Sequence, residues 1–436
     1  MKKCLVRLFS IALFGISAAQ ASTENEAAVR DGLGNFIAKA RSGRPVKVAY
    51  LGGSITAMNG WRNLTTEWLR CEFPRAKVTE IAASIGGTGS DLGAFRVHHD
   101  ALCHDPALIF VEFATNDGKR PPDAIVRQME GIVRQIWAKD PKTDVVFAYT
   151  FTQGAVKAYR RGTVQSAVKA MERVAGHYGI PSVNFGYRVM DEIDAGRLVV
   201  SLKEAETAVP QETPERDRII AGELAKKGKI LFSKDGVHPA MPGHEFYLKS
   251  VQNLYALAKD VRPADHAAKM AAGPLDERNL QNAKMVAITP KMLVGPWEKS
   301  ERMNGNERFV ARMDEIWETK TPGAKLVFAF NGTQCRVYDI VGPDGGQVWI
   351  TVDGRRSERP LARFDGYCTY HRMLNFPVYD GEPGRHTVEI EVDDDQPDRK
   401  PVAFRLKNPE RELATPKYDG TCFRPGKILI AGDMCD

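Results

Sequence analysis

Short apolar runs alternate with amphipathic stretches between residues 26 and 260. Five runs have the length and composition of buried strands, at residues 46–51, 78–83, 107–113, 144–150 and 180–184. Helical periodicity lies between and after them, over residues 60–73, 90–103, 122–138, 161–178 and 239–260. Strands that alternate with helices require right-handed crossovers, so we expect a parallel sheet covered by helices on both faces. Ligands bind such sheets outside the carboxyl ends of the strands, and we expect the chemistry there.

The pattern changes twice after this alternation. Residues 186–230 are polar and charged, which indicates an insertion of short helix and loop beside the site, and residues 261–285 are typical of a connector. Over residues 286–436, Gly, Pro and Asp turns separate short apolar runs at 325–330, 334–340, 347–352 and 386–392. This spacing predicts a β-sandwich or jelly-roll domain. We expect Trp297, Trp317 and Trp349 to pack in its core, with a carbohydrate platform as the alternative.

The chain begins with the features of a secretory signal peptide over residues 1–21. Lys2 and Lys3 precede an apolar stretch at residues 8–18, which is short for a membrane span, and small residues follow before Ser22. We therefore expect a periplasmic or secreted protein whose first domain covers residues 22–260, with a membrane-anchoring helix as the alternative. No later run is apolar enough for a transmembrane helix, so we expect no stable membrane insertion after removal of the signal.

The charge of the chain and the spacing of its potential metal ligands argue against nucleic-acid binding and metal binding. Lys2, Lys3 and Arg7 supply three charges of the formal net charge of +6, and no long Lys/Arg block remains. A nucleic-acid-binding surface is therefore not expected. No Cys-x-x-Cys motif or His/Cys cluster has metal-ligand spacing, and Asp393-Asp394-Asp395 is more typical of a solvated turn than of a calcium loop. The sequence predicts no metal and no other cofactor.

The cysteine count points to disulfides. The chain has seven cysteines, and removal of the signal peptide removes Cys4 and leaves six, an even number in an exported protein. We prefer pairing of neighbours because it keeps the first pair within one domain, which gives the pairs 71–103, 335–368 and 422–435. Buried free thiols are the alternative.

Two glycine-rich turns follow the first two predicted strands. Leu51-Gly52-Gly53-Ser54-Ile55-Thr56 allows a tight strand-to-helix turn that exposes the hydroxyl of Ser54. A phosphate-binding loop would look similar, but the Lys and Ser/Thr of a P-loop are missing here. Ser84-Ile85-Gly86-Gly87-Thr88-Gly89-Ser90 could direct a backbone N–H toward an anion, or could simply connect a strand to a helix.

Two polar segments complete the set at the same edge of the sheet. Ala114-Thr115-Asn116-Asp117 follows the third strand, where the side-chain amide of Asn116 could donate a hydrogen bond into a site. Asp235-Gly236-Val237-His238 enters the last helix of the domain. A carboxylate three residues before an imidazole can hold its useful tautomer, so that His238 takes the proton of Ser54.

These four segments, in this order, make the chain similar to the SGNH or GDSL-type hydrolase family over about residues 44–255. The resemblance implies a flavodoxin-like three-layer α/β/α domain with Ser54 as the nucleophile of a triad completed by Asp235 and His238. It also implies an oxyanion hole formed by Ser54, Gly87 and Asn116. Two positions depart from the family pattern: Gly53 replaces the usual Asp before the nucleophile, and Thr115 replaces the usual Gly before Asn116.

The resemblance implies ester hydrolysis, and the domain architecture suggests the substrate. The β-rich second domain looks similar to jelly-roll modules attached to carbohydrate esterases, so we expect removal of acetyl groups from a polysaccharide or oligosaccharide. A lipase or general short-chain esterase would use the same residues. A carbohydrate-binding protein with an inactive hydrolase domain and an acyltransferase are further alternatives, because water and alcohols compete for the same acyl-enzyme.

Overall fold

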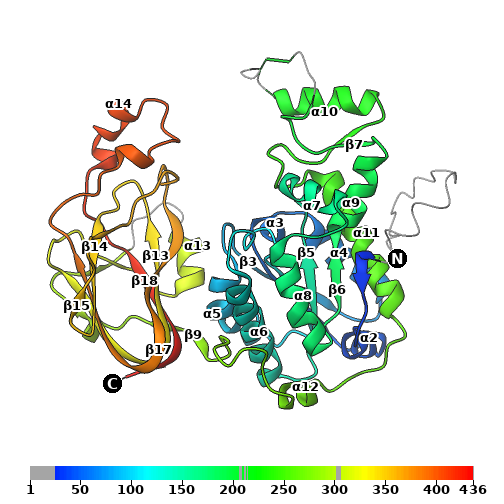
Figure 1. Ribbon diagram of the computed structural model, residues 1–436, viewed down its shortest axis with the longest axis horizontal. Helices are drawn as coiled ribbons and strands as arrows, with labels where there is room; N and C mark the ends of the chain where they lie inside the picture. Colours follow the sequence, from blue (N-terminus) through cyan, green and yellow to red (C-terminus); the bar gives the residue numbers. More distant parts are fainter. Residues whose placement is uncertain (1–24, 206–208, 211–212, 214, 301–305, 436) are drawn as a thin grey trace. The chain divides into compact units, whose positions relative to one another are not determined.

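The computed structural model describes residues 25–205, 209–210, 213, 215–300 and 306–435. The chain divides into two compact units, Met1–Gln281 and Asn282–Asp436, which occupy the blue-to-green and the green-to-red parts of the colour scale in Figure 1. The predicted signal peptide, residues 1–21, lies outside the described residues. Within the described ranges, no helix is both long and apolar enough to cross a bilayer.

The first unit is built on a six-stranded sheet with the strand order β1-β6-β5-β4-β2-β3. Its strands are β1 (Ala27–Ala28), β2 (Val46–Gly52), β3 (Val78–Ser84), β4 (Leu108–Glu112), β5 (Asp144–Tyr149) and β6 (Ser182–Asn184). The strands β2 to β6 are parallel, and β1 adds to β6 in the antiparallel direction. The five parallel strands fall on the five predicted runs, in the order of a flavodoxin-like sheet, which confirms the predicted fold class.

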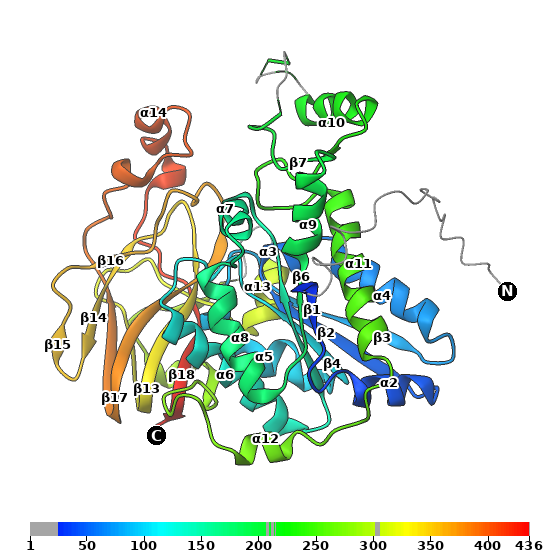
Figure 2. The ribbon, with the colours of Figure 1, turned by 45° about the vertical axis from the view of Figure 1, so that its right-hand side comes forward.

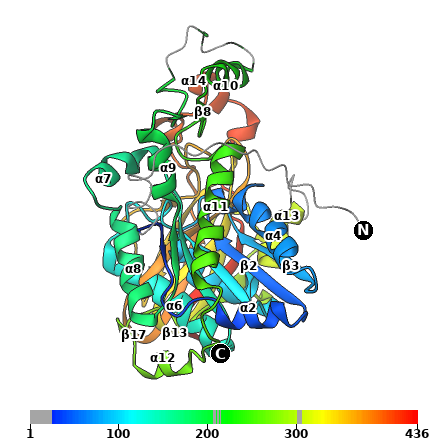
Figure 3. The same cartoon turned by 90° about the vertical axis from the view of Figure 1, so that its right-hand side faces the viewer.

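Helices cover both faces of this sheet, as Figure 2 shows. One layer contains α5 (Ser90–Asp100), α6 (Pro122–Lys139) and α8 (Ser166–Tyr178). The other contains α2 (Gly34–Arg41), α4 (Trp61–Glu72), α9 (Phe185–Asp194) and α11 (Met241–Ala258), with α11 in front in Figure 3. Successive strand residues point to opposite faces, so Val48 and Tyr50 of β2 pack in the core beneath α4 and α11.

The predicted insertion at residues 186–230 forms helices and short strands over much of its described length. After α9 the chain forms a short parallel pair, β7 (Leu198–Val199) with β8 (Ile230–Leu231), and α10 (Arg216–Lys226) lies between them in sequence. This segment has a small apolar core of its own, formed by Ala205, Ile220, Leu224 and Leu231. Its fold is therefore stabilised locally by hydrophobic burial.

The predicted connector packs against the first unit over most of its length. His266 is buried and stacks on Trp137 of α6 with ring centroids 4.5 Å apart. Further along, the buried carboxylate of Glu130 accepts hydrogen bonds from the backbone N–H groups of Leu275 and Asp276. Residues 261–281, including the short helix α12 (Ala267–Ala271), therefore belong to the α/β unit rather than to a free linker.

The second unit contains one antiparallel eight-stranded sheet, which confirms the predicted β domain. Its strands are β9 (Ala283–Ala287), β10 (Leu293–Val294), β13 (Lys325–Val341), β14 (Gln347–Val352), β15 (Arg355–Arg356), β16 (Leu361–Ala362), β17 (Arg372–Val392) and β18 (Pro425–Met434). Val348 of β14 and Ile288, just after β9, lie near opposite ends of the strand order but share one core. The sheet must therefore curl, and bulges in β13 between Gly332 and Arg336 allow the bend.

Two of the three tryptophans pack in this unit's core as predicted. Trp317 is buried in the core cluster, and Trp297 packs against it and donates its indole N–H to the carbonyl of Val294. Trp349 is half-buried on β14, where its indole N–H donates to Asp393 and Arg356 lies 4.5 Å from the ring centroid. The aspartate run at 393–395 thus begins with a residue that accepts hydrogen bonds from its own sheet.

The predicted disulfides are not formed, and no disulfide joins any two of the six described cysteines. Cys71 lies on α4, whereas Cys103 follows α5 on the opposite face of the sheet. Cys422 and Cys435 flank the two ends of β18, a ten-residue strand that separates them by roughly 30 Å, far beyond the 4.4–6.8 Å that a disulfide allows. Pairing of neighbours in sequence was wrong because the fold extends the intervening chain.

The third predicted pair is separated by a strand as well. Cys335 is buried in the middle of β13, while Cys368 belongs to a second cluster around Val341, where β13 ends. Burial raises the pKa of both thiols, so each behaves as a small apolar side chain rather than as a thiolate.

A buried histidine makes the stability of the first unit depend on pH. His244 of α11 is 1 % exposed, and neither ring nitrogen has a hydrogen-bond partner in the described part of the chain. Its ring lies against Gly60, where an added Cβ would come within 2.5 Å of the ring atoms. Burial lowers the pKa of His244 to about 4, so acid conditions must force a proton into an apolar site or unfold the protein.

We expect the wild type to lose about 2–3 kcal/mol of unfolding free energy through His244 between pH 7.5 and 4.5. The sign follows from a folded pKa below the unfolded value of about 6.5, because the unfolded chain then binds more protons as the pH falls. The variant His244→Leu should lack this component. Urea unfolding of both proteins at the two pH values measures it, and equal acid sensitivity of the two would contradict the assignment.

Candidate active site

The register of three neighbouring strands places their carboxyl ends in one row. Gly52, the last residue of β2, pairs with Ser84 at the end of β3 and with Glu112 at the end of β4. The loops that follow these strands therefore start side by side. Because β3 and β4 lie on opposite sides of β2, this row is also the switch point where such sheets form crevices.

Ser54 lies in the tight turn after β2. Gly53 adopts an extended conformation, and the short helix α3 (Ser54–Ala57) begins immediately after it. The carbonyl of Gly52 accepts hydrogen bonds from the backbone N–H of Ile85 and from Arg96 Nη2, both at 3.0 Å. Ser54 is half-buried, so its hydroxyl is held in a fixed place and still reaches solvent.

The structure brings Ser54, His238 and Asp235 into one hydrogen-bonded line. Ser54 Oγ lies 2.8 Å from His238 Nε2, and His238 Nδ1 lies 2.7 Å from Asp235 Oδ2. An ionised carboxylate can only accept, so Nδ1 carries the proton that it donates to Asp235. In the neutral imidazole Nε2 is then left as an acceptor for the Ser54 hydroxyl, which is the arrangement that general-base catalysis needs.

The loop before α11 holds Asp235 through its other oxygen. Asp235 Oδ1 accepts hydrogen bonds of 2.9 Å from the hydroxyl of Ser233 and from the backbone N–H groups of Val237 and His238. Burial acts to raise the pKa of Asp235, but the hydrogen bonds from the imidazole, the two N–H groups and the hydroxyl outweigh it and hold the pKa well below its usual range. The carboxylate is therefore charged, and able to orient His238, at neutral and mildly acidic pH.

The two other predicted site residues gather at the same turn. Gly86 lies against the nucleophile, because an added Cβ there would stand 3.7 Å from the Cβ of Ser54. Gly87 follows with a φ of 75°, a backbone conformation that favours glycine. The side chain of Asn116 contacts Gly53 on the other side of the turn. Gly86, which precedes Gly87, and Asn116 thus lie on two sides of the turn that carries Ser54.

Comparison with known proteins identifies a family for part of the first unit. Residues 50–246 match the GDSL-like lipase/acylhydrolase family. Within the first unit, residues 50–246 therefore carry a GDSL-like lipase/acylhydrolase domain. No curated protein matches the chain in sequence.

Solved structures share the fold of the whole chain. Two crystal structures of a two-domain esterase, described as active on acetylated mannans, match it with TM-scores of 0.67 and 0.68. The first of these was co-crystallised with mannopentaose. Sequence identity is 20% and 19%, and in both cases the match covers 95% of this chain and 99% of the other. The succession of an α/β unit and a β unit is therefore a fold that this chain shares with that two-domain esterase.

The two departures of the GDSL-like domain from its family pattern have structural reasons. A Cβ on Gly53 would come within 2.0 Å of Asn116 Oδ1, so this domain has no room there for the usual Asp. The hydroxyl of Thr115, in place of the usual Gly, lies 2.7 Å from the hydroxyl of Thr150 at the end of β5. At both positions, the residue that departs from the family pattern contacts a neighbouring loop.

Sequence reasoning missed the buried polar side chains that hold these loops. Arg96 of α5 is fully buried and donates to the carbonyls of Ala83 and Gly52, at the ends of β3 and β2. Asp117 accepts from the backbone N–H of Ser90, which joins the Asn116 loop to the start of α5. Burial raises the pKa of Asp117 to about 6. For Arg96 the available signal was a charged residue between Phe95 and Val97 on a predicted helix, whereas Asp117 lies in a polar segment that gives no such signal.

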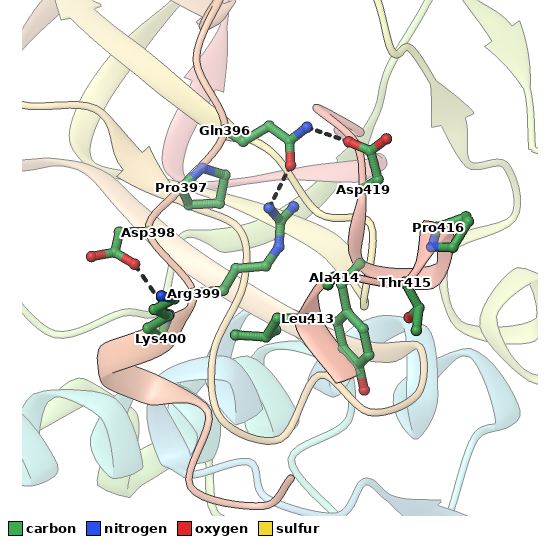
Figure 4. A pocket seen from close by; sticks show the side chains of 11 residues that line it. Gln396, Pro397, Asp398, Arg399, Lys400, Leu413, Ala414, Thr415, Pro416 and Asp419 are labelled. Carbon is green, nitrogen blue, oxygen red and sulfur yellow. Dashed lines mark hydrogen bonds between the residues drawn. The ribbon is translucent and has the colours of Figure 1, made fainter. Parts of the chain in front are cut away.

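The described residues contain no group of three or more His, Cys, Asp or Glu side chains that could hold a metal ion. The second unit has a cavity of about 380 Å³, shown in Figure 4, in which Arg399 donates to Gln396 and Gln396 donates to Asp419. Its polar groups bond to one another, and it contains none of the predicted site residues.

The contact between Gly53 and Asn116 gives a direct test of the site. We expect Gly53→Ala to lower kcat for an aryl acetate at least ~10-fold if the side-chain amide of Asn116 is an oxyanion donor, because the new methyl group must displace that amide. Gly176→Ala is the matched control, since an added Cβ there meets no heavy atom within 4 Å. Steady-state kinetics and a melting curve of both variants separate the effects, and unchanged kcat in Gly53→Ala would exclude Asn116 from the oxyanion hole.

Proposed function

We propose that this chain is an exported serine ester hydrolase that removes O-acetyl groups from a polysaccharide. In this proposal Ser54 is the nucleophile, His238 the general base and Asp235 the residue that orients it. The observation that carries the proposal is the hydrogen-bonded line from Asp235 Oδ2 through the imidazole to Ser54 Oγ, at 2.7 and 2.8 Å. Membership of residues 50–246 in an acylhydrolase family supports the same reaction class.

The first half of the reaction forms an acyl-enzyme. Ser54 Oγ attacks the ester carbonyl carbon while His238 Nε2 accepts the hydroxyl proton, and the carbonyl oxygen becomes an oxyanion. The N–H groups of Ser54 and Gly87 and the side-chain amide of Asn116 would donate to that oxygen. The bond to the sugar oxygen then breaks, and His238 returns the proton to the departing hydroxyl group of the sugar.

The second half regenerates the enzyme with water. His238 takes a proton from a water molecule, whose oxygen attacks the acyl carbon. The bond between that carbon and Ser54 Oγ then breaks, His238 returns the proton to Ser54 Oγ, and the carboxylic acid leaves. The negative charge of Asp235 stabilises the imidazolium in both halves, and its low pKa keeps that charge in place under acidic conditions. In this proposal His238 carries each proton that moves between Ser54, the sugar oxygen and water.

The substrate class rests on architecture. The two-domain esterase with the same fold is described as active on acetylated mannans, and this chain carries the same succession of an α/β domain and a β domain. The signal peptide that the sequence predicts at residues 1–21 favours export, which would bring the enzyme to polymers outside the cytoplasm. We therefore favour an acetylated polysaccharide, such as a mannan or a xylan, over a lipid.

Acetate release from polymers tests the proposal. We expect the purified protein to release acetate from acetylated mannan or acetylated xylan, and Ser54→Ala to lower the rate by at least ~10³-fold, since the variant has no nucleophile. Ser42→Ala is the control, because Ser42 is exposed and its hydroxyl bonds to near neighbours in sequence, donating to the carbonyl of Lys39 and accepting from Arg44 Nε. Aryl esters of increasing acyl length are assayed in parallel.

The outcomes separate the possible functions. Hydrolysis of long-chain esters alone would replace the polysaccharide substrate with a lipid-like one. Acyl transfer to an added sugar in preference to water would indicate a transferase. Absence of acid release from every ester, by wild type and Ser54→Ala alike, would overturn the hydrolase proposal.

A further inference from the structure

A buried carboxylate lies directly beneath the nucleophile turn. Glu112, the last residue of β4, is 1 % exposed. One of its oxygens accepts a hydrogen bond of 2.7 Å from the hydroxyl of Thr56, and the backbone N–H of Gly53 also donates to the carboxylate. Gly53 precedes Ser54 and Thr56 follows it by two residues, so the carboxylate holds the turn on both sides of the nucleophile.

The same carboxylate reaches the loop that carries Asn116. Its other oxygen accepts a hydrogen bond of 2.8 Å from the hydroxyl of Thr150, just after β5. The hydroxyl of Thr150 lies 2.7 Å from that of Thr115, the neighbour of Asn116 in sequence. A continuous chain of hydrogen bonds therefore runs from the turn of Ser54 through Glu112 to the Asn116 loop.

We propose that Glu112 is a positioning residue, which sets the nucleophile turn and the Asn116 loop at the separation that the oxyanion hole requires. This inference rests on the proposed function, since it assigns Asn116 and Ser54 to one reaction centre. Glu112 supplies from the neighbouring strand the buried carboxylate that the chain lacks at Gly53, where the family usually has Asp. The hydroxyl of Thr115, the second departure from the family pattern, bonds to Thr150 and so connects the Glu112 carboxylate to the Asn116 loop.

The cost of burying the Glu112 carboxylate is offset by its hydrogen-bond donors. Burial raises the pKa of Glu112, and the hydrogen bonds from Thr56, Thr150 and Gly53 act against this effect. The three donors are uncharged and come from two segments, the nucleophile turn and the residue just after β5, so the carboxylate is accommodated only when both segments are in place. A buried apolar side chain would fill the same space without fixing the direction of any loop.

The test compares Glu112→Gln with a matched variant, Glu130→Gln. Glu130 is also fully buried in the first unit, and like Glu112 it accepts from three uncharged donors. These are the hydroxyl of Tyr178 and the backbone N–H groups of Leu275 and Asp276. It lies on α6 and holds the segment around Leu275 rather than the site. Substitution of either residue removes a buried charge and gives an amide donor that faces existing donors.

We expect Glu112→Gln to lower kcat for an aryl acetate at least about tenfold with KM within about twofold, because misplacement of the attacking oxygen affects the transition state and not substrate binding. Glu130→Gln should leave kcat within about twofold at a comparable loss of melting temperature. Equal kinetic effects of the two variants would show a general structural role and overturn the proposal.

A second pair of variants covers the case in which Glu112→Gln does not fold. Thr150→Val leaves the carboxylate in place but breaks its link to Thr115, and we expect a fall in kcat. Thr143→Val, at the other end of β5, removes a buried hydroxyl that donates to the carbonyl of Pro106 and should leave kcat unchanged. Loss of kcat in neither variant, or in both equally, would contradict the proposed linkage.

Amide hydrogen exchange separates this inference from the proposed function. In Glu112→Gln, exchange should accelerate in residues 50–57 and 113–118, and in Glu130→Gln it should not. If the wild type hydrolyses no ester but this exchange pattern is found, the positioning contact stands and the hydrolase proposal fails. If the wild type is active and exchange in both segments is unchanged, Glu112 does not position them.

Discussion

The site depends on the parallel register of β2 with its two neighbours. Because Gly52 pairs with both Ser84 and Glu112, the loops after three strands begin in the same row and at the spacing of hydrogen-bonded strands. A shift of one residue in either pairing would turn each following side chain to the other face of the sheet. The serine turn, the glycine turn and the asparagine loop can therefore surround one point only in this register.

Buried polar groups hold the loops once the register has aligned them. Arg96 draws the ends of β2 and β3 together through their carbonyls, Asp117 ties the asparagine loop to α5, and Glu112 lies beneath the serine turn. Each is costly to bury, and each is accommodated by partners from different segments. Such groups give a site rigidity that apolar packing cannot supply, since hydrogen bonds have direction and hydrophobic contacts have almost none.

Much of the fold could be predicted from periodicity, and the failures have specific causes. The five parallel strands and the main helices fall where the apolar pattern placed them. In the second unit, by contrast, β13 runs through both predicted strands at 325–330 and 334–340, because its ladder continues across a bulge where Gly332 and Thr333 suggested a turn. The helix α2 and the packed connector were missed, since their burial depends on partners that are distant in the sequence.

The sequence by itself determined the residues of the candidate site and their order along the chain. Ser54, Gly87, Asn116, Asp235 and His238 could be singled out because each follows a predicted strand or enters a helix at one edge of the sheet. Only the tertiary structure decided which buried side chains hold these residues in place and which cysteines lie too far apart to form disulfides. Partners such as Glu112 with Thr150, and distances such as that between the ends of β18, are set by long-range packing, and local sequence carries little information about contacts of that kind.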